Sequence, residues 1–331
     1  MKRKYLAILL MLNLFFMGTI LSIPSSILIS EYILANRIDK SDTLYCSSTE
    51  PLLKKELNLN IDLGQVEINY ISQPVDYLMK VDIVIEMGGN NLAGKSYSDF
   101  FAFEWQNTSD IVNFTLEIKA GVDLDRLLAL IEKINILVTL RADVVCDFNI
   151  NMKMDGDVKL TVPFKVSVGC ITTNITNGDI LYNINFGIVG GNITGIIQET
   201  GNIEIITTEV EYTQNSTWSL DTYDGDISLQ IYQNSNMNAN VSGIFSITYG
   251  NINFKYRDNN DNSGAYFTLY YEVNDLALAQ KISEVVGFDT DLDPEQTIFY
   301  LESYDYPAQN NYNLLFYNPN GRYLILDIVS S

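Results

Sequence analysis

The sequence predicts a mainly β protein in which a β-solenoid, or β-helix, is built from rungs of about 22–25 residues. Three observations predict this fold. A short phrase of glycine, then aspartate or asparagine, then Ile or Val occurs five times. Its copies lie 22, 23, 24 and 25 residues apart. Each copy is followed by a run of alternating apolar and polar residues, which is typical of strands with one buried face.

The glycines of the five phrases are expected at corners of the rungs. They are Gly156, Gly178, Gly201, Gly225 and Gly250. Glycine permits a tight corner, aspartate and asparagine tolerate a left-handed φ, and the next residue enters the core. In a stack these glycines form a column with about 4.8 Å between neighbours. The alternative fold is an antiparallel β-sandwich or meander, in which one period is one hairpin and the glycines lie at alternate ends.

The N-terminal residues indicate export. Three basic residues at positions 2–4 precede a nearly continuous apolar run from Tyr5 to Ile23. As a helix, this run is long enough to cross a bilayer. We expect residues 1–35 to be a signal peptide or an N-terminal membrane anchor, with its basic end in the cytoplasm. Residues 36–60 are polar and irregular, and we expect a linker there.

Two short helices are expected near the ends of the stack. Residues 61–141 form an N-terminal β region with strand-like runs and one amphipathic helix, "DLDRLLALIEKI", which begins after Asp123 and has Ile131 on its apolar face. Residues 142–272 form the β-strand repeat domain. Residues 273–331 form an α/β cap with a second helix in "NDLALAQKISEVVG". Such caps would shield the ends of the repeats.

Charge and composition exclude several functions. The chain has 41 acidic and 20 basic residues, a net charge of −21, and no Lys or Arg between Val166 and Phe254. We therefore expect no binding of nucleic acid, because a field of this sign repels phosphates. Histidine is absent, which removes the commonest general base and metal ligand. We expect a protein without catalytic activity and without a cofactor.

Clustered acidic residues suggest calcium sites or a catalytic row, but none fits a known template. The possible calcium ligands are Asp258, Asp261, Asn262 with Gly264 nearby, and Asp289, Asp291, Asp293. Neither group matches the EF-hand pattern, and we interpret both as turns. Asp157, Asp179 and Asp226 recur at the corners, as in β-helix enzymes that cleave polysaccharides. We interpret them as corner residues, and the sequence assigns no catalytic, cofactor-binding or metal-ligating residue.

The three cysteines, Cys46, Cys146 and Cys170, are too few for a disulfide scaffold. Cys146 and Cys170 lie 24 residues apart, which is one period, and alternation points both into the core. In neighbouring rungs they could form a disulfide or remain two buried thiols. The 21 tyrosines are interpreted mainly as packing residues, although an aromatic ladder can also bind sugars by stacking.

The phrases "NGDI", "TGNIEI", "DGDISLQI" and "YGNINF" resemble the putative-adhesin β-strand-repeat family and are similar to the head GIN domain of autotransporter adhesins. The resemblance covers about Ile61 to Tyr271. It implies an exported β-solenoid with an adhesive or surface-structural role and transfers no catalytic residue. We expect a cell-surface protein, membrane-anchored by its N-terminal helix or secreted after cleavage, with an unknown protein or glycan partner. The alternative is a carbohydrate-active β-helix enzyme that uses carboxylates.

Overall fold

The computed structural model describes residues 37–47, 54–89, 92–235, 237, 239–257 and 311–317, and the backbone alone of 265–272, 288–291, 298–303, 310 and 323–329. The predicted signal peptide or anchor over residues 1–35 lies outside this part of the chain, as does the predicted helix of the C-terminal cap. No helix among the described residues is long and apolar enough to cross a membrane.

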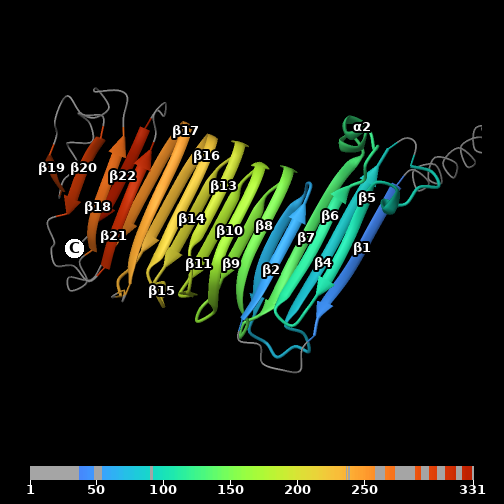
Figure 1. Cartoon of the computed structure of the whole chain (residues 1–331), viewed down its shortest axis with the longest axis horizontal. Coiled ribbons are helices and arrows are strands. Elements are labelled where there is room, and N and C mark those ends of the chain that lie inside the picture. The colour runs from blue at the N-terminus through green and yellow to red at the C-terminus, as the bar shows by residue number, and fades with distance from the viewer. Residues whose placement is uncertain are drawn as a thin grey trace, which may run out of the picture.

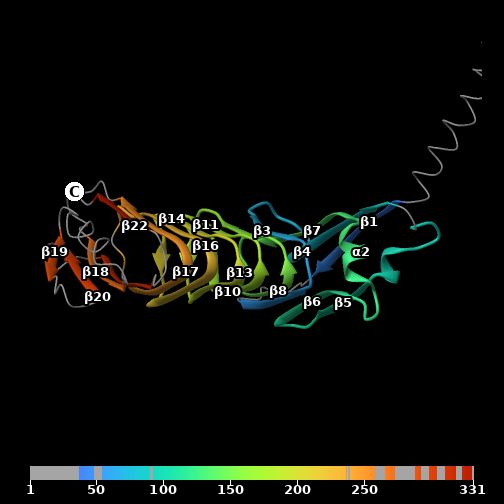
Figure 2. The same ribbon diagram turned by 90° about the horizontal axis from the view of Figure 1, so that it is seen from above.

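The molecule is elongated, and its strands run across the long axis in two layers (Figures 1 and 2). All described strands belong to one mixed sheet. The predicted mainly β class is therefore confirmed. The described helices are the five-residue α2 (Leu124–Leu128) and a 3-10 turn, η1 (Tyr97–Asp99).

The first layer contains the strands that precede the repeated corner. In the order of their pairing they are β5 (Phe101–Asn107), β6 (Ile111–Ile118), β2 (Lys54–Ile61), β8 (Val145–Asp155), β10 (Ser167–Asn177), β13 (Ile193–Thr200), the first halves of β16 (Ser216–Tyr232) and β17 (Asn240–Arg257), β21 (Asn310–Tyr317), β18 (Ala265–Glu272), β20 (Ile298–Ser303) and β19 (Phe288–Asp291).

The second layer contains the strands that follow the corner. They are β1 (Arg37–Cys46), β4 (Met79–Gly88), β7 (Ile131–Arg141), β3 (Gln65–Ile71), β9 (Val158–Val162), β11 (Ile180–Asn185), β14 (Ile203–Thr208), the second halves of β16 and β17, and β22 (Tyr323–Val329). Two short strands, β12 (Ile188–Val189) and β15 (Glu211–Tyr212), pair in parallel with each other, and β12 also pairs with the start of β10.

Equivalent positions of consecutive repeats pair in parallel. Ile180 lies opposite Val158 on one side and Ile203 on the other, and Ile227 lies opposite both Ile203 and Ile252. One period of sequence therefore crosses both layers once. The repeats do not form the antiparallel meander that was the alternative, because each strand pairs with the same strand of the next repeat.

The predicted column of glycines is present. A Cβ added at Gly178, Gly201 or Gly225 would overlap the carbonyl oxygen of the preceding glycine in the series. Each of these three glycines also has a positive φ, between +117° and +153°. Alanine would be unfavourable on both counts. The column begins one rung earlier than the sequence predicts, at Gly64, whose carbonyl oxygen lies against Gly156.

The predicted linker over residues 36–60 is wrong at the level of secondary structure, because these residues form β1 and most of β2. β2 and β3 make a rung with Gly64 at its corner. This rung lies between two later ones, since β2 pairs with both β6 and β8. β3 likewise pairs with β7 and β9. The irregular composition of the segment hid a strand whose partners are far away in sequence.

The predicted N-terminal helix is shorter than expected. Asp123 caps it as predicted, since its side chain accepts a hydrogen bond from the backbone N–H of Arg126. The helix ends at Leu128, because Ile131 already pairs with Met87 of β4 as the first residue of β7. Long-range pairing of β7 along two neighbouring strands outweighs the local helical periodicity.

The predicted inward position of Cys170 is also wrong. Val168 lies opposite Cys146 and Ile171 lies opposite Phe148, so Gly169 and Cys170 together face one residue. This bulge reverses the alternation. Cys146 is buried and Cys170 is exposed, and both are free thiols. Neither of the two alternatives, a disulfide or a pair of buried thiols, is therefore present.

The core lies between the two layers and follows the predicted alternation. Its largest fully buried side chains include Trp218, Tyr182, Tyr256 and Phe254. Burial of a side chain of this kind contributes roughly 1.5–3 kcal/mol. These aromatic residues confirm that several tyrosines pack in the core. Others, among them Tyr45 and Tyr223, are exposed.

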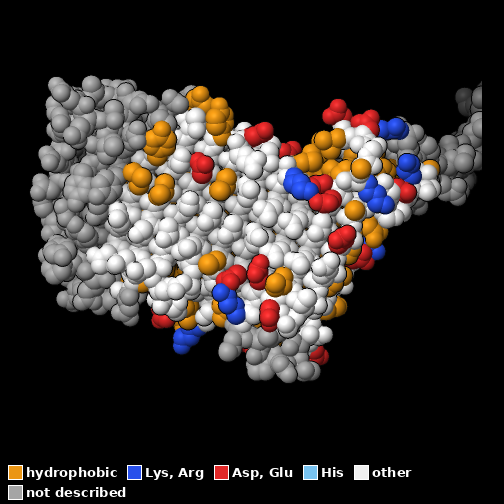
Figure 3. Space-filling model, viewed as in Figure 1, with side chains coloured by type: hydrophobic (Ala, Val, Ile, Leu, Met, Phe, Trp, Pro, Cys, Tyr) orange, Lys and Arg blue, Asp and Glu red, His pale blue; other side chains and the backbone are white. Residues whose placement is uncertain are grey.

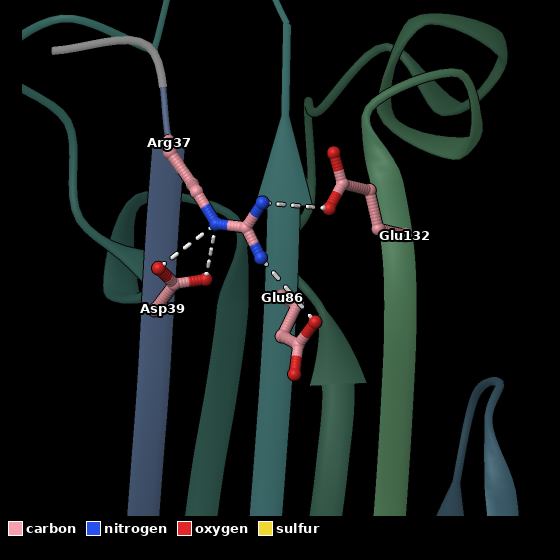
Figure 4. A network of polar contacts seen from close by, with 4 residues as sticks. All are labelled: Arg37, Asp39, Glu86 and Glu132. Carbon is pink, nitrogen blue, oxygen red and sulfur yellow. Dashed lines mark hydrogen bonds and ion pairs between the residues drawn. The ribbon is translucent and has the colours of Figure 1, made fainter. Parts of the chain in front are cut away.

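The parallel stack ends in antiparallel strands. β5 pairs antiparallel with β6, β20 with β18, and β4 with β7. At the N-terminal end, the Arg37 guanidinium of β1 contacts Asp39 on the same strand, Glu86 of β4 and Glu132 of β7 (Figure 4). This network links three strands, and the hydrogen bond with Asp39 is the main reason why the pKa of Arg37 is raised.

Candidate functional site

The predicted corner residues form a ladder of hydrogen bonds. The Asp157 carboxylate accepts from the backbone N–H of Asp179 at 3.0 Å, and Asp179 accepts from Asn202 at 2.8 Å. The series continues through Asn202 to Asp226 and from Asp226 to Asn251. Each side chain therefore satisfies a backbone donor of the next rung. These contacts support the interpretation as corner residues, and they leave the carboxylates engaged in the stack.

The ladder explains why both aspartate and asparagine occur at one position. Only the side-chain oxygen is needed as an acceptor, and each residue has one. Where asparagine is present, its amide can also donate: Asn202 Nδ2 donates to Asp179 at 3.0 Å. Asn202 also separates the carboxylates of Asp179 and Asp226, whereas Asp157 and Asp179 occupy neighbouring rungs.

The possible calcium ligands remain outside the described side chains. Asp289 and Asp291 lie on β19, of which only the backbone is described, and the others lie outside the described residues. Among the described side chains, no group of three or more His, Cys, Asp or Glu is arranged to hold a metal ion.

Exposed aromatic side chains lie in pairs on neighbouring rungs. Phe164 and Phe186 are 62% and 46% exposed, and their ring centroids are 6.0 Å apart. Tyr223 and Tyr249 form a second pair with centroids 5.4 Å apart. Large rings usually bury most of their surface, so adjacent exposed rings mark a candidate interaction surface. The sequence did not separate these rings from the core aromatics.

The backbone at Phe186 strengthens this interpretation. Phe186 has a φ of +52°, in the left-handed region that bulky residues rarely adopt. Such a conformation costs about 1–3 kcal/mol. Asparagine or glycine would relieve this strain, and an exposed ring gains little from burial. Neither the backbone nor the core therefore explains a phenylalanine at this corner.

A cavity of about 400 Å³ lies at the N-terminal end of the molecule, and we call it the end cavity. The turn around η1, the loop after β6 and α2 surround it. Its lining residues are Lys95, Asp99, Phe100, Lys119, Ala120, Gly121, Val122, Asp123, Arg126, Leu127 and Leu130. In Figure 3, hydrophobic and charged side chains gather at the α2 end, whereas the face over the repeats is mostly uncharged.

Local contacts fix the walls of the end cavity. The Lys119 backbone N–H donates to the Phe100 carbonyl oxygen at 2.8 Å, which joins the end of β6 to the turn after η1. The Asp99 carboxylate accepts from the Ser96 backbone N–H at 2.7 Å and so closes the capping box of η1. Asp123 caps α2 in the same way. Both acidic residues of the cavity thus accept hydrogen bonds from backbone N–H groups.

A buried lysine lies near the same end, and sequence reasoning missed it. Lys55 is 2% exposed, and its ammonium group donates to the Thr108 carbonyl oxygen at 3.0 Å and to Asn107 Oδ1 at 3.4 Å. Cys46 Sγ also donates to Asn107 Oδ1. Lys55 lies opposite Cys146, whose pKa is raised by burial. In the segment "KKELNLNI", Lys55 alternates with Leu57 and Leu59, and this pattern predicts that its side chain points into the core. Burial, and not the nearby Lys55 ammonium, which acts in the opposite direction, keeps the Cys146 thiol protonated and unreactive.

The fold and these surfaces define an elongated β-repeat protein with exposed aromatic pairs and a basic-lined end cavity. No family model and no curated protein matches the chain. Among solved structures, it is similar to a putative cell adhesion protein from Clostridium sporogenes, with 13% identity, 88% of this chain and 100% of that chain covered, and a TM-score of 0.32.

Two further structures give similar values. A putative adhesin from Bacteroides fragilis has 9% identity, with 88% of this chain and 97% of that chain covered, and a TM-score of 0.31. A putative lipid binding protein from Parabacteroides distasonis has 11% identity, with coverage of 88% and 97%, and a TM-score of 0.30. At these TM-scores, the likeness establishes neither a shared fold nor a shared function.

Proposed function

We propose that the chain is an exported cell-surface protein, adhesin-like or surface-structural, and without catalytic activity. Its parallel repeats act as a β-solenoid, a stiff spacer that holds an interaction surface away from the cell. The N-terminal apolar run anchors the protein in the membrane or directs its secretion. The observation that carries this proposal is the exposed aromatic pair Phe164 and Phe186, held on neighbouring rungs.

Two rigid aromatic rings at one corner suit a binding surface. Aromatic side chains dominate the energetics of many protein interfaces, because they bury much area with few rotatable bonds. The same rings can stack on the faces of sugars. Lys165 lies beside them, with its ammonium group 5.0 Å from the centroid of the Phe164 ring. The partner is therefore a protein or a glycan on a neighbouring surface.

The corner carboxylates support a structural role over catalysis. A glycosidase needs two carboxylates free to act on the substrate as acid and as nucleophile or base. Asp157, Asp179 and Asp226 instead accept backbone N–H groups of the next rung. The chain also lacks histidine. The carbohydrate-active enzyme is therefore the weaker candidate.

Adhesion of cells that display the full chain tests this proposal. The variant Phe164→Ser/Phe186→Asn removes both rings, and asparagine tolerates the positive φ at position 186. We expect at least a tenfold loss of binding to a panel of immobilised matrix proteins and glycans, with an unchanged or higher Tm. Ile244→Ser is the matched control, because Ile244 is 51% exposed and lies in β17, away from the pair.

Two results would contradict the proposal. Adhesion that is unchanged in the aromatic variant would remove the observation on which it stands. Release of reducing sugars from any polysaccharide of the panel would favour the enzyme instead, provided that the activity disappears when Asp179 is replaced.

A further inference from the structure

We propose that the end cavity binds a small amphipathic anion, a molecule with one carboxylate or phosphate group on an apolar chain. This inference concerns a different surface from the aromatic pairs and does not depend on the proposed adhesive function. It stands on three features of the cavity: its excess of positive charge, its apolar wall and its volume.

Three cations converge on the end cavity: Lys95, Lys119 and Arg126. Among the described residues, none of the three has a carboxylate within ion-pair distance. Seven other basic residues of this strongly acidic chain do have such partners: Arg37, Lys40, Lys54, Lys80, Arg141, Lys153 and Lys159. In the described part of the chain, Lys55, Lys133, Lys165 and Lys255 also lack an ion pair, but none of them lines the end cavity. Three cations without an ion pair outnumber the two acidic residues, Asp99 and Asp123, that line the same cavity. In a chain of net charge −21, this local excess of positive charge favours an anionic ligand.

The two acidic residues of the cavity form hydrogen bonds with the backbone and do not form ion pairs with the three cations. Asp99 accepts the hydrogen bond of the η1 capping box, and Asp123 accepts that of α2. The pKa of Asp99 is lowered, mainly by the backbone hydrogen bond from Ser96, with smaller contributions from Lys95 and Lys119. Lys95 and Lys119 therefore favour the charged form of Asp99, although neither forms an ion pair with it.

The cavity also has an apolar wall. Phe100 and Leu127 line it and are 9% and 1% exposed, and Val122 and Leu130 complete the wall. Lys95 lies over the Phe100 ring, with its Nζ atom 5.4 Å from the ring centroid. Val122 and Leu130 are only half-buried, so a charged head can lie beside the cations while its chain contacts these two side chains.

The volume limits the size of the ligand. At about 400 Å³, the cavity falls at the lower end of the range of roughly 300–1,000 Å³ that small-molecule pockets occupy. A single short chain with one head group suits this space. Lysine binds such a group as a point charge, and the guanidinium of Arg126 can hold two oxygens of a carboxylate or phosphate at once.

Photolabelling of the full chain in neutral phosphatidylcholine nanodiscs tests the proposal. The probe is decanoate that carries a diazirine, and the labelled residues are mapped by mass spectrometry. We expect the label within residues 92–130. Decanoate or decyl phosphate should compete, and decanol or inorganic phosphate should compete at least tenfold less well. Labelling should also weaken as the salt concentration rises.

Variants with matched charge locate the site. Lys95→Gln/Lys119→Gln/Arg126→Gln should lose at least tenfold in labelling. The control, Lys133→Gln/Lys165→Gln/Lys255→Gln, removes the same charge from residues that do not line the cavity and should label like the wild type. A second variant, Ala120→Trp, keeps the three cations and fills the cavity, and it should also lose the label.

The remaining outcomes distinguish a bilayer lipid from a soluble amphiphile as the ligand and define the results that would overturn the proposal. Competition by phosphatidylglycerol in the disc, at the strength of decyl phosphate, would identify a bilayer lipid as the source of the anion. Competition only by the free compounds would identify a soluble amphiphile. Equal competition by decanol, equal labelling of the first triple variant and its control, or a label outside residues 92–130 would each overturn the proposal.

Discussion

Replacement of Gly201 by alanine tests the central feature of the fold. Gly201 lies in the middle of the glycine column and has a φ of +153°, and an added Cβ would overlap the carbonyl oxygen of Gly178. The backbone N–H of Gly178 donates to the Thr200 carbonyl oxygen at 2.9 Å, and that of Ile180 donates to the Asn202 carbonyl oxygen at 2.9 Å, so both bonds join the same two rungs. To accept a methyl group, the two rungs must separate at this corner.

The expected cost combines strain and lost hydrogen bonds. A non-glycine residue in a sparsely populated region of φ and ψ costs about 1–3 kcal/mol. Two weakened backbone hydrogen bonds add roughly 1 kcal/mol each. We therefore expect Gly201→Ala to lower the free energy of unfolding by about 3–5 kcal/mol. Urea denaturation followed by circular dichroism measures this difference.

Gly94→Ala is the matched control. Gly94 also has a positive φ, +72°, but nothing lies within 4 Å of an added Cβ. This variant should therefore show the conformational cost alone, about 1–2 kcal/mol. If Gly201→Ala destabilises the protein no more than Gly94→Ala does, contact between stacked rungs is not the reason for glycine at the corner.

Three further predictions concern single side chains. Asp179→Ala should lower the free energy of unfolding by about 1–2 kcal/mol, because a backbone donor loses its acceptor, whereas Asp179→Asn should cost less than half as much in the same urea titration. In the native protein, iodoacetamide should modify Cys170 and spare Cys146 until urea unfolds the chain; mass spectrometry that finds equal rates would contradict the bulge. The pKa of Glu67 is lowered by hydrogen bonds from Asn69 and then Lys159. Its contribution to stability is therefore present above its unfolded pKa of about 4.3 and lost as the pH falls through the lower folded value. The difference in urea midpoint between wild type and Glu67→Gln should disappear over that range, and a difference that persists at pH 2 would exclude this cause.

The sequence was a good guide wherever structure depends on local alternation or on the repeated corner. Alternation identified the buried side of β9, β11 and β14, and the spacing of the glycines predicted their column. Both signals are local, because a strand with one buried face and a corner that needs glycine each leave a mark within a few residues.

The sequence was a poor guide where a distant partner or one extra residue decides the result. β2 reads as an irregular segment, yet β6 and β8 enclose it. The helix after Asp123 has a helical period up to Ile131, but pairing with β4 ends it early. At Cys170, a single bulge residue reverses the face of the strand, which alternation alone could not reveal.

The candidate sites were less predictable than the fold. Phe164 and Phe186 occupy ordinary apolar positions in the pattern, and only their exposure and the φ of Phe186 distinguish them. The end cavity joins Lys95, Lys119 and Arg126, which lie far enough apart in sequence that no motif connects them. Sites of this kind arise from the way the ends of the stack close.

The ends of the stack differ from its repeats in the direction of strand pairing. Identical parallel rungs could add without limit, since each exposes the same unpaired edge to the next. Here the described ends change direction: β4 and β1 follow β7 in antiparallel pairing, and β20 and β19 follow β18. β1 also carries alternating charges, including Arg37 and Lys40, which oppose pairing with another chain. Among the described strands, these features oppose the addition of further rungs at β1 and β19. We therefore expect a partner to bind at the corners or at the end cavity, where the exposed rings and the cations without ion pairs lie.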